Sequence, residues 1–512
     1  MKQAMRAFLL LFLFSCCLNI ICSAQEKAVL YISDTGKTMI SKHIYGQFAE
    51  HLGRSVYDGF YRNGKIRMDI VSALKEIKVP NLRWPGGCFA DQYHWREGIG
   101  EIGKRPQTVN TTWGMVAEDN SFGTDEFMRL CKLIGCEPYI AGNVGTGSPQ
   151  EMKDWIEYLN FSGASTLTGL RAASGHPAPY QVSLWGVGNE SWGCGGNMTP
   201  EYYAGLYKHF ASFCPDYPGA PLKKIISGAN ADDYHWTEVM MKDIGPDNAW
   251  GLSLHYYTFP TGKWNPRGSA TRFTEHEYAQ TLAEALKMET IINKHEAIMN
   301  KYDPKKKMAL LVDEWGVWTD VEPGTKSYAM YQQNSLRDAL IAATTLNIFN
   351  NHADRIKEAN LAQAVNVIQS LILTKGDQML LTPTYYVFDL YQVHQDGSLL
   401  SIKINSPKYQ IGKDKVNAVN ASASRDGKGI THISLVNLDP HQMVSIASKL
   451  PAETGEVVTG QILTSAKFTD VNTFEQPDKV QVKAFSDAKI TGQTLNLNLP
   501  PLSMVMLTIK NR

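Results

Sequence analysis

Residues Val182–Trp192 read Val-Ser-Leu-Trp-Gly-Val-Gly-Asn-Glu-Ser-Trp, and they carry the clearest structural signal in the chain. The apolar run from Val182 to Val187 predicts a buried strand. This run stops at a Gly-Asn-Glu turn, which puts Asn189 and Glu190 at the carboxyl end of the strand, where barrel enzymes carry catalytic acids. Taken alone, the pattern fits an ordinary strand that ends in a polar loop equally well.

A second stretch repeats the same pattern. Residues Met308–Gly316 read Met-Ala-Leu-Leu-Val-Asp-Glu-Trp-Gly, an apolar run followed by Asp313 and Glu314. Two separate strands therefore each deliver a glutamate at the carboxyl end. Hydrolysis of a glycosidic bond uses two carboxyl groups that face each other across the bond. The pair Glu190 and Glu314 meets this requirement, which favours a catalytic pair over two unrelated acidic loops.

Strand and helix patterns alternate eight times between residues 43 and 390, which predicts an α/β domain. Eight such units indicate closure into a (β/α)8 TIM barrel, with an open doubly wound sheet as the alternative. None of the strands is followed by a Gly-rich phosphate loop, so we expect no nucleotide cofactor. The expected strands are Ile44–His51, Asn81–Trp84, Pro138–Ala141, Val182–Val187, Lys224–Gly228, Gly251–Tyr256, Met308–Asp313 and Ala359–Ala364.

The pattern changes after Tyr391. Short alternating segments bounded by turns follow, of which Thr494–Leu499 is the clearest, and they predict an all-β sandwich over residues 391–512. The segment Lys27–Ser33 alternates in the same way and has no role in a barrel. We therefore expect residues 25–42 to add an N-terminal strand to the sandwich.

The first 24 residues have the character of a signal peptide. Lys2 and Arg6 precede an apolar run that is too short for a comfortable membrane span, and small residues flank a cleavage position after Ala24. The segment Leu13–Cys16 leaves a lipid anchor open as an alternative. The expectation is an exported protein, periplasmic in the first instance, with lipid-anchored and secreted locations as alternatives.

Composition excludes several classes of function. The 512 residues are 43% hydrophobic and 20% charged, and Lys+Arg and Asp+Glu both number 50, so no basic excess points to nucleic acid. An odd number of cysteines follows residue 24, which leaves at least one thiol free. Cys131 and Cys136 flank a predicted helix end and are expected in the core. Neither the cysteine nor the histidine spacing matches a zinc site, so no metal is expected.

Three further motifs resemble one known family. They are Gly46–Arg54 (Gly-Gln-Phe-Ala-Glu-His-Leu-Gly-Arg), Arg83–Gly87 (Arg-Trp-Pro-Gly-Gly) and Asp313–Gly316 (Asp-Glu-Trp-Gly). Together with Gly-Asn-Glu, these motifs are similar to those of glycoside hydrolase family 51, the α-L-arabinofuranosidases. The resemblance covers the whole chain after residue 24. It implies an exo-acting, retaining enzyme that releases terminal arabinofuranosyl residues from arabinan, arabinoxylan or related oligosaccharides, and it implies a homo-oligomer, commonly a hexamer.

The resemblance also implies roles for individual positions. Glu190 matches the acid/base and Glu314 the nucleophile. The other matched positions bind the sugar or surround the nucleophile: Glu50, Arg83, Trp113, Asn189, His255, Tyr257 and Gln363. One position departs from the family, because Cys88 stands after Pro-Gly-Gly where many members have Asn. A sugar-binding amide is thereby lost, which puts fine specificity in question but not the reaction class.

Two other readings of the same residues compete. A β-xylosidase or a β-1,4-endoglucanase would use the same scaffold and the same carboxyl pair. A non-catalytic carbohydrate-binding protein would need neither glutamate, and the presence of both argues against it. The segments Asn110–Asp119 and Thr258–Thr274 are long enough to wall a closed pocket, as an exo-acting enzyme requires.

Overall fold

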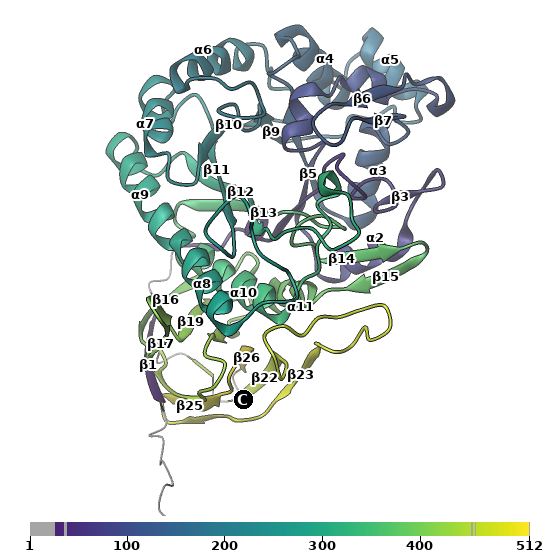
Figure 1. Cartoon of the computed structure of the whole chain (residues 1–512). Coiled ribbons are helices and arrows are strands. Elements are labelled where there is room, and N and C mark those ends of the chain that lie inside the picture. Colours follow the sequence, from purple (N-terminus) through teal and green to yellow (C-terminus); the bar gives the residue numbers. More distant parts are fainter. Residues whose placement is uncertain (1–25, 35–37, 452–453, 456, 511–512) are drawn as a thin grey trace, which may run out of the picture.

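The computed structural model describes residues 26–34, 38–451, 454–455 and 457–510. Figure 1 shows a barrel with an all-β domain against one side of it, and the N-terminal strand running through that second domain. The predicted combination of a TIM barrel with a β-domain that takes in the N-terminal strand is confirmed.

Eight parallel strands close the barrel in the spatial order β10-β11-β12-β13-β2-β5-β8-β9, so the open doubly wound alternative is wrong. Helices cover the outside of the barrel, which explains why its strands read as near-continuous apolar runs. The barrel strands are β2 (Gly46–Phe48), β5 (Asn81–Trp84), β8 (Glu137–Gly142), β9 (Leu184–Val187), β10 (Lys223–Asn230), β11 (Gly251–Thr258), β12 (Ala309–Val317) and β13 (Ile356–Leu361).

The helices begin at recognisable caps. Ser148 accepts a hydrogen bond from the N–H of Glu151, with Pro149 at the first helical position, and Thr199 caps the helix that starts at Pro200 in the same way. No helix of the described residues is both long enough and apolar enough to cross a membrane. The α-helices are α2 (Met68–Glu76), α3 (Thr124–Ile134), α4 (Pro149–Asn160), α5 (Thr166–Ala173), α6 (Pro200–Ala211), α7 (Tyr234–Asp243), α8 (Glu275–Ala285), α9 (Lys287–Tyr302), α10 (Leu336–Asn351) and α11 (Pro383–Tyr391).

Two elements differ from the sequence-based expectation. The first strand was expected over Ile44–His51, but Ile44 and Tyr45 lie in a 3-10 turn, η1 (Lys42–Tyr45), because the Ser41 side chain caps that turn. The sequence also predicts one long helix over roughly Tyr278–Asn300, but the structure divides it into α8 and α9 at Leu286, whose ψ of −9° departs from the regular helical value. Neither change moves a barrel strand out of order.

Short strands and 3-10 turns lie in the segments that connect the main strands and helices. They are β3 (Tyr61–Arg62), β4 (Lys65–Ile66), η2 (Cys88–Gln92), η3 (Trp95–Gly98), η4 (Ile102–Lys104), β6 (Thr108–Asn110), β7 (Val116–Glu118), η5 (Ser327–Ala329), β14 (Ile372–Lys375), β15 (Gln378–Leu381) and η6 (Gln392–His394). Of these, η2 and the β6–β7 hairpin follow β5 and lie over the carboxyl end of the barrel.

A ten-stranded sheet forms the second domain, in the order β23-β22-β26-β20-β19-β16-β1-β21-β25-β24. Its two ends approach each other, since β22 contacts β24 across an apolar core. Strand β1 (Glu26–Ser33) pairs antiparallel with β16 and parallel with β21, so both ends of the chain build this domain. The other strands are β16 (Ser398–Asn405), β19 (Val419–Arg425), β20 (Thr431–Asn437), β21 (Val444–Lys449), β22 (Val457–Thr464), β23 (Val482–Phe485), β24 (Ala488–Thr491), β25 (Thr494–Leu499) and β26 (Ser503–Lys510), beside a separate hairpin of β17 (Lys408–Ile411) and β18 (Asp414–Asn417). The expected domain boundaries at residues 42–43 and 390–391 stay predictions.

A buried polar cluster joins the barrel to this sheet. The Asn347 side chain on α10 accepts hydrogen bonds from three hydroxyls, at 2.8 Å from Tyr391, 2.8 Å from Ser422 and 2.6 Å from Ser434. All four side chains are buried. Buried hydroxyls are costly to leave without an acceptor, so one amide oxygen fixes the relative position of α10, β19 and β20.

Replacing Asn347→Ala removes that shared acceptor, and we expect it to lower the free energy of unfolding by about 2–4 kcal/mol. Urea denaturation followed by circular dichroism measures the change. Asn293→Ala, on the exposed face of α9, is the matched control and is expected within about 0.5 kcal/mol of the parent. Equal stability of the two variants would show that the cluster does not hold the domains together.

Candidate active site

All ten side chains that the sequence predicts for the site lie at the carboxyl end of the barrel, in two groups of contacts around Arg83 and Glu50. Each lies in the carboxyl-terminal half of a barrel strand or directly after it, except for two on the segments that follow β5, because the strand ends of a parallel barrel converge there. They are Glu50, Arg83, Cys88, Trp113, Asn189, Glu190, His255, Tyr257, Glu314 and Gln363.

Arg83 on β5 lies at the centre of the first group of contacts. Its Nη1 donates to Glu314 Oε1 at 2.8 Å, and its Nη2 donates to Asn189 Oδ1 at 2.5 Å. Its Nε lies 3.7 Å from Asp313 Oδ2, and the guanidinium stands 4.7 Å from the centre of the Phe48 ring. Burial disfavours the charged guanidinium, but the carboxylates of Asp313 and Glu314 outweigh it and raise the pKa of Arg83. A permanent positive charge therefore sits in the middle of the site.

Asn189 is held so that its amide nitrogen stays available. Its oxygen accepts from Arg83, whereas its buried Nδ2 has no partner among the described residues. The backbone N–H of Asn189 donates to Asp91 Oδ2 at 3.0 Å, and Asp91 Oδ1 accepts from the N–H groups of Val144 and Gly145. Burial raises the pKa of Asp91 to about 7 against the effect of these three donors. Asp91 thus joins the loops after β8 and β9 to η2 by hydrogen bonds. No sequence motif predicted this role.

The two predicted catalytic carboxyl groups converge. One carboxylate oxygen of Glu190, one of Glu314 and a ring nitrogen of His255 all lie within 4.8 Å of one another. His255 and Glu314 are register neighbours on β11 and β12, which puts the ring between the two carboxyl groups. Glu190 has a φ of 40°, the left-handed region that side-chain-bearing residues avoid, and such backbone is concentrated at functional sites.

Each oxygen of the pair has a defined neighbour. His255 Nδ1 donates to Glu190 Oε1 at 2.8 Å and lies 3.6 Å from Glu314 Oε2. Tyr257 donates from its hydroxyl to Glu314 Oε2 at 2.8 Å. Glu314 therefore accepts on both oxygens, from Arg83 and Tyr257, which fixes the orientation of its carboxyl group.

Burial and neighbouring charge separate the protonation states. Burial raises the pKa of Glu190, the negative charge of Glu314 adds to this, and the hydrogen bond from His255 opposes it. Burial lowers the pKa of His255, but the surrounding carboxylates, Glu314 first, outweigh it and raise that pKa to about 10. The imidazole is consequently charged at neutral pH: its Nδ1 donates to Glu190, and its Nε2 forms an ion pair with Asp313, 3.2 Å from Oδ1.

Glu50 forms a second anchor on the other side of the pocket. Its Oε1 accepts from the Phe89 backbone N–H and from Trp113 Nε1, both at 2.9 Å, and its Oε2 accepts from Gln363 Nε2 at 3.1 Å. Burial and the charge of Glu314 raise the pKa of Glu50 to about 7.

Gly86 and Gly87 let the backbone pass between Glu50 and Glu314. A Cβ on Gly86 would lie 2.7 Å from Glu50 Cγ, and one on Gly87 would lie 2.7 Å from Glu314 Oε1. The Pro-Gly-Gly motif after β5 is therefore explained by close packing of backbone against carboxyl groups.

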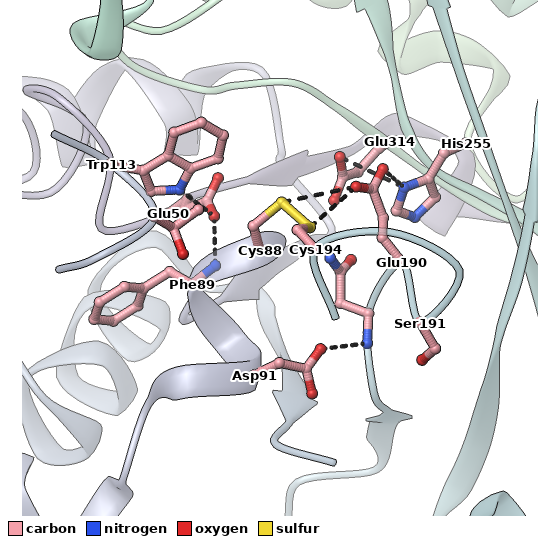
Figure 2. The surroundings of a disulfide bond; sticks show 12 residues. Glu50, Cys88, Phe89, Asp91, Trp113, Glu190, Ser191, Cys194, His255 and Glu314 are labelled. Carbon is pink, nitrogen blue, oxygen red and sulfur yellow. Dashed lines mark hydrogen bonds and ion pairs between the residues drawn. A yellow bond between two sulfur atoms is a disulfide. The ribbon is translucent and has the colours of Figure 1, made fainter. Parts of the chain in front are cut away.

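Cys88 forms a disulfide with Cys194, from the loop after β9, with Cα atoms 5.4 Å apart. From the sequence, Cys88 was expected only to remove an amide, and this bond was not predicted. Cys131, Cys136 and Cys214 are free, which agrees with an odd number of thiols. Cys131 is buried in the core as expected, whereas Cys136 is half-buried and packs against the core. Figure 2 shows the disulfide against the Glu190 side chain, opposite His255.

A cavity of about 680 Å³ opens beside Glu190 and the disulfide. Aromatic side chains dominate its walls: Trp113, Trp192, Tyr234, Tyr256, Tyr257, Phe259, Trp264 and Trp318. Trp113 comes from the expected wall segment Asn110–Asp119, and Phe259 and Trp264 come from Thr258–Thr274. Flat aromatic faces beside convergent carboxyl groups suit a sugar ring.

Two groups of three side chains bring possible metal-ligating atoms together in the described part of the chain. The first contains both sulfurs of the disulfide, which are not thiolates and bind metals poorly. The second consists of Glu190, His255 and Glu314, the convergent groups described above.

Comparison with known proteins agrees with this geometry. The model of the α-L-arabinofuranosidase 1 domain matches residues 73–281, and that of the α-L-arabinofuranosidase C-terminal domain matches residues 313–503. An intracellular exo-α-L-arabinofuranosidase of Bacteroides ovatus is 48% identical over 95% of this chain and 96% of its own. α-L-Arabinofuranosidase C of Emericella nidulans is 30% identical, over 85% of this chain and 89% of its own.

One sequence-based prediction is wrong by this comparison. The chain was expected to be exported, with a periplasmic location first, whereas the Bacteroides ovatus relative is named an intracellular enzyme. The predicted signal peptide over residues 1–24 and the alternative lipid-anchor segment Leu13–Cys16 lie outside the described residues.

Solved structures extend the similarity to three dimensions. The GH51 arabinofuranosidase from Xanthomonas axonopodis pv. citri has a TM-score of 0.93 and 46% identity, over 94% of this chain and all of its own. An α-L-arabinofuranosidase from Thermotoga maritima, solved with arabinose, has a TM-score of 0.81 and 29% identity, over 94% of this chain and 99% of its own. The chain belongs to the α-L-arabinofuranosidases of glycoside hydrolase family 51.

Proposed function

We propose that the chain is a retaining exo-α-L-arabinofuranosidase that releases terminal arabinofuranosyl residues from arabinan, arabinoxylan or related oligosaccharides. The observation that carries this proposal is the approach of Glu190 and Glu314 to within 4.8 Å, with His255 between them. Carboxyl groups about 5 Å apart leave no room for a water between them, which is the geometry of double displacement.

In the first step, Glu314 attacks the anomeric carbon as Glu190 protonates the departing glycosidic oxygen. Arg83 and Tyr257 donate to Glu314 and hold its carboxyl group in place. Because His255 donates to Oε1 of Glu190, the transferable proton of Glu190 resides on Oε2, and Glu190 lines the cavity. The bond to the leaving alcohol breaks, and an ester forms between the sugar and Glu314.

In the second step, Glu190 is ionised and takes a proton from water. The resulting hydroxide attacks the anomeric carbon, the ester to Glu314 breaks, and Glu190 regains the proton that it needs for the next cycle. The charged His255 stabilises the ionised form of Glu190 during the interval, so the two groups titrate as a pair.

Asn189 and Glu50 supply the sugar-binding contacts. The unpartnered Nδ2 of Asn189 can donate to the hydroxyl beside the anomeric carbon, and a hydrogen bond at that position strengthens as positive charge develops on the ring. Glu50, fixed by three donors, can accept from the remaining furanose hydroxyls.

An endo-acting enzyme on the same scaffold is the remaining alternative. A xyloglucanase from Paenibacillus polymyxa and a bifunctional glucanase-xylanase share the fold at TM-scores of 0.62, but at 10% and 12% identity. The aromatic walls contributed by Phe259 and Trp264 favour a short, enclosed binding site over a long groove. Product analysis on linear arabinan, branched arabinan and arabinoxylan decides between the two: arabinose alone supports the proposal, and internal oligosaccharides contradict it.

The family resemblance also supports an oligomer, and we propose that the chain assembles as a hexamer. Light scattering after size-exclusion chromatography tests the proposal, since the chain mass is 57.0 kDa. A mass equal to one chain would contradict it.

Glu314→Gln is expected to reduce kcat by at least about 10⁴-fold, because the amide cannot form the ester intermediate, although its single oxygen can still accept from Arg83 or from Tyr257. Hydrolysis of an aryl α-L-arabinofuranoside measures the loss. Glu358→Gln is the matched control: burial raises the pKa of Glu358 well above its usual value, so the substitution replaces a neutral group in the barrel interior. Near-normal activity of Glu314→Gln would remove the proposed nucleophile.

Glu190→Ala is expected to slow natural oligosaccharides at least about 100-fold more than dinitrophenyl arabinofuranoside, whose leaving group departs without a proton. The alkaline limb of the kcat/KM profile is also expected to disappear in this variant with the activated substrate. This limb reports the loss of the Glu190 proton, and the raised pKa of Glu190 moves the limb to higher pH in the parent enzyme. Equal losses on both substrates would contradict the acid role.

A further inference from the structure

The Cys88–Cys194 disulfide lies directly against one oxygen of Glu190. Sγ of Cys88 is 3.7 Å from Glu190 Oε2, and Sγ of Cys194 is 3.3 Å from the same atom. Figure 2 shows both sulfurs on the side of the carboxyl group that is opposite His255. A disulfide sulfur carries no hydrogen, so these contacts bring two heavy atoms to the oxygen without any hydrogen-bond donor.

This oxygen is the one that matters for proton transfer. The other oxygen of Glu190, Oε1, already accepts from His255 at 2.8 Å. Oε2 is therefore left to carry the proton and to deliver it into the cavity, which the disulfide itself helps to line. A donor beside Oε2 would favour the ionised carboxylate and compete with that delivery.

We propose that the Cys88–Cys194 disulfide is a positioning element for the acid/base Glu190: it fills the space beside Oε2 without offering a donor, and its reduction to two thiols supplies donors that slow protonation of the leaving group. The proposal rests on the acid role of Glu190 in the proposed function. It also gives Cys88 a role in place of the amide that many family members carry there.

The loop that bears Cys194 is anchored independently of the disulfide. Ser191 N–H donates to Ser227 Oγ at 3.2 Å, and Trp192 Nε1 donates to the Gly228 carbonyl at 3.0 Å. Asn189 N–H is held by Asp91, as described above. Breaking the S–S bond therefore leaves the loop attached to β10 and η2, and the principal change is chemical, at Oε2.

The bond is open to a small reductant, because Cys194 is exposed and both sulfurs line the cavity. A thiolate of dithiothreitol attacks Cys194 Sγ, the Sγ–Sγ bond breaks, and its electron pair leaves on Cys88. The second thiol of the reagent then closes the cyclic disulfide and releases Cys194. Two electrons and two protons pass to the protein, and the reagent is oxidised to its disulfide.

The remaining charged and titratable groups that face Glu190 do not change on reduction. They are His255 and Tyr257 from β11, Glu314 from β12 and Arg83 from β5. A shift in the alkaline limb of the pH profile therefore reports the new donors. Free thiols also titrate in the alkaline range, so hydroxyls, which do not, give the cleaner comparison.

Two double variants separate the donor effect from the loss of the covalent bond. Cys88→Ser with Cys194→Ser breaks the bond and adds two hydroxyl donors, whereas Cys88→Ala with Cys194→Ala breaks the bond and adds none. With oligosaccharide substrates, the serine pair is expected to lose about 10-fold in kcat relative to the alanine pair. Its alkaline limb is also expected to move to lower pH, while that of the alanine pair stays near the parent. Dithiothreitol acting on the parent enzyme is expected to lower kcat as the serine pair does.

Several comparisons keep the outcomes distinct. Cys136→Ser, at a free thiol away from the site, is the control for the serine substitution, and melting temperatures verify that both pairs fold. Equal losses in the serine and alanine pairs, or an unmoved alkaline limb in the serine pair, would overturn the proposal and leave the disulfide as a simple clamp. Failure of the proposed function would give a different result. The Glu190→Ala variant would then lose the same activity on substrates with good and poor leaving groups, whatever the activity of the cysteine variants.

Discussion

The site depends on one buried cation, the Arg83 guanidinium. It donates to a carboxylate on β12 and to an amide after β9, two strands that are not neighbours in the barrel. Removing one partner from a buried, hydrogen-bonded charge pair leaves the other charge uncompensated, which costs several kcal/mol. The same contacts orient the amide of Asn189 with its nitrogen outward. Arg83 therefore links β5 to β12 and to the loop after β9, and it orients the side chains of Glu314 and Asn189.

The proposed mechanism gives opposite roles to two chemically identical side chains, and their surroundings differ accordingly. Glu314 receives donors on both oxygens, whereas Glu190 is buried with one oxygen beside His255 and the other beside a disulfide. Environment separates the protonation of paired carboxyl groups in glycosidases generally. In this chain, the disulfide offers no hydrogen-bond donor to Glu190, and in our proposal it thereby contributes to the difference in protonation between Glu190 and Glu314.

Most of the barrel and the position of the candidate site were predictable from the sequence, because parallel strands with apolar runs and polar ends have strong local signatures. Strand β5 was predicted with its observed bounds, and Glu190 follows β9 as expected, but Glu314 lies within β12 rather than after it. Strand β24 was missed because it is a four-residue strand at the edge of the sheet. Strand β16 lies in the middle of the sheet and was missed because its buried and exposed side chains do not alternate regularly. Asp91 and the Cys88–Cys194 bond were missed for a different reason: both depend on loops that meet only in three dimensions, and cysteine spacing does not define pairing.

The central claim is that the carboxylate paired with Arg83 is the one that attacks the sugar. The most direct measurement uses an arabinofuranose-configured epoxide, which is opened by a nucleophilic carboxylate and remains attached as an ester. Mass spectrometry of the digested, inactivated enzyme then locates the added mass. If Glu314 is the nucleophile, we expect one label per chain, on the peptide that contains Glu314. A label on the peptide of Glu190 or of Glu50, with Glu314 unmodified, would contradict it.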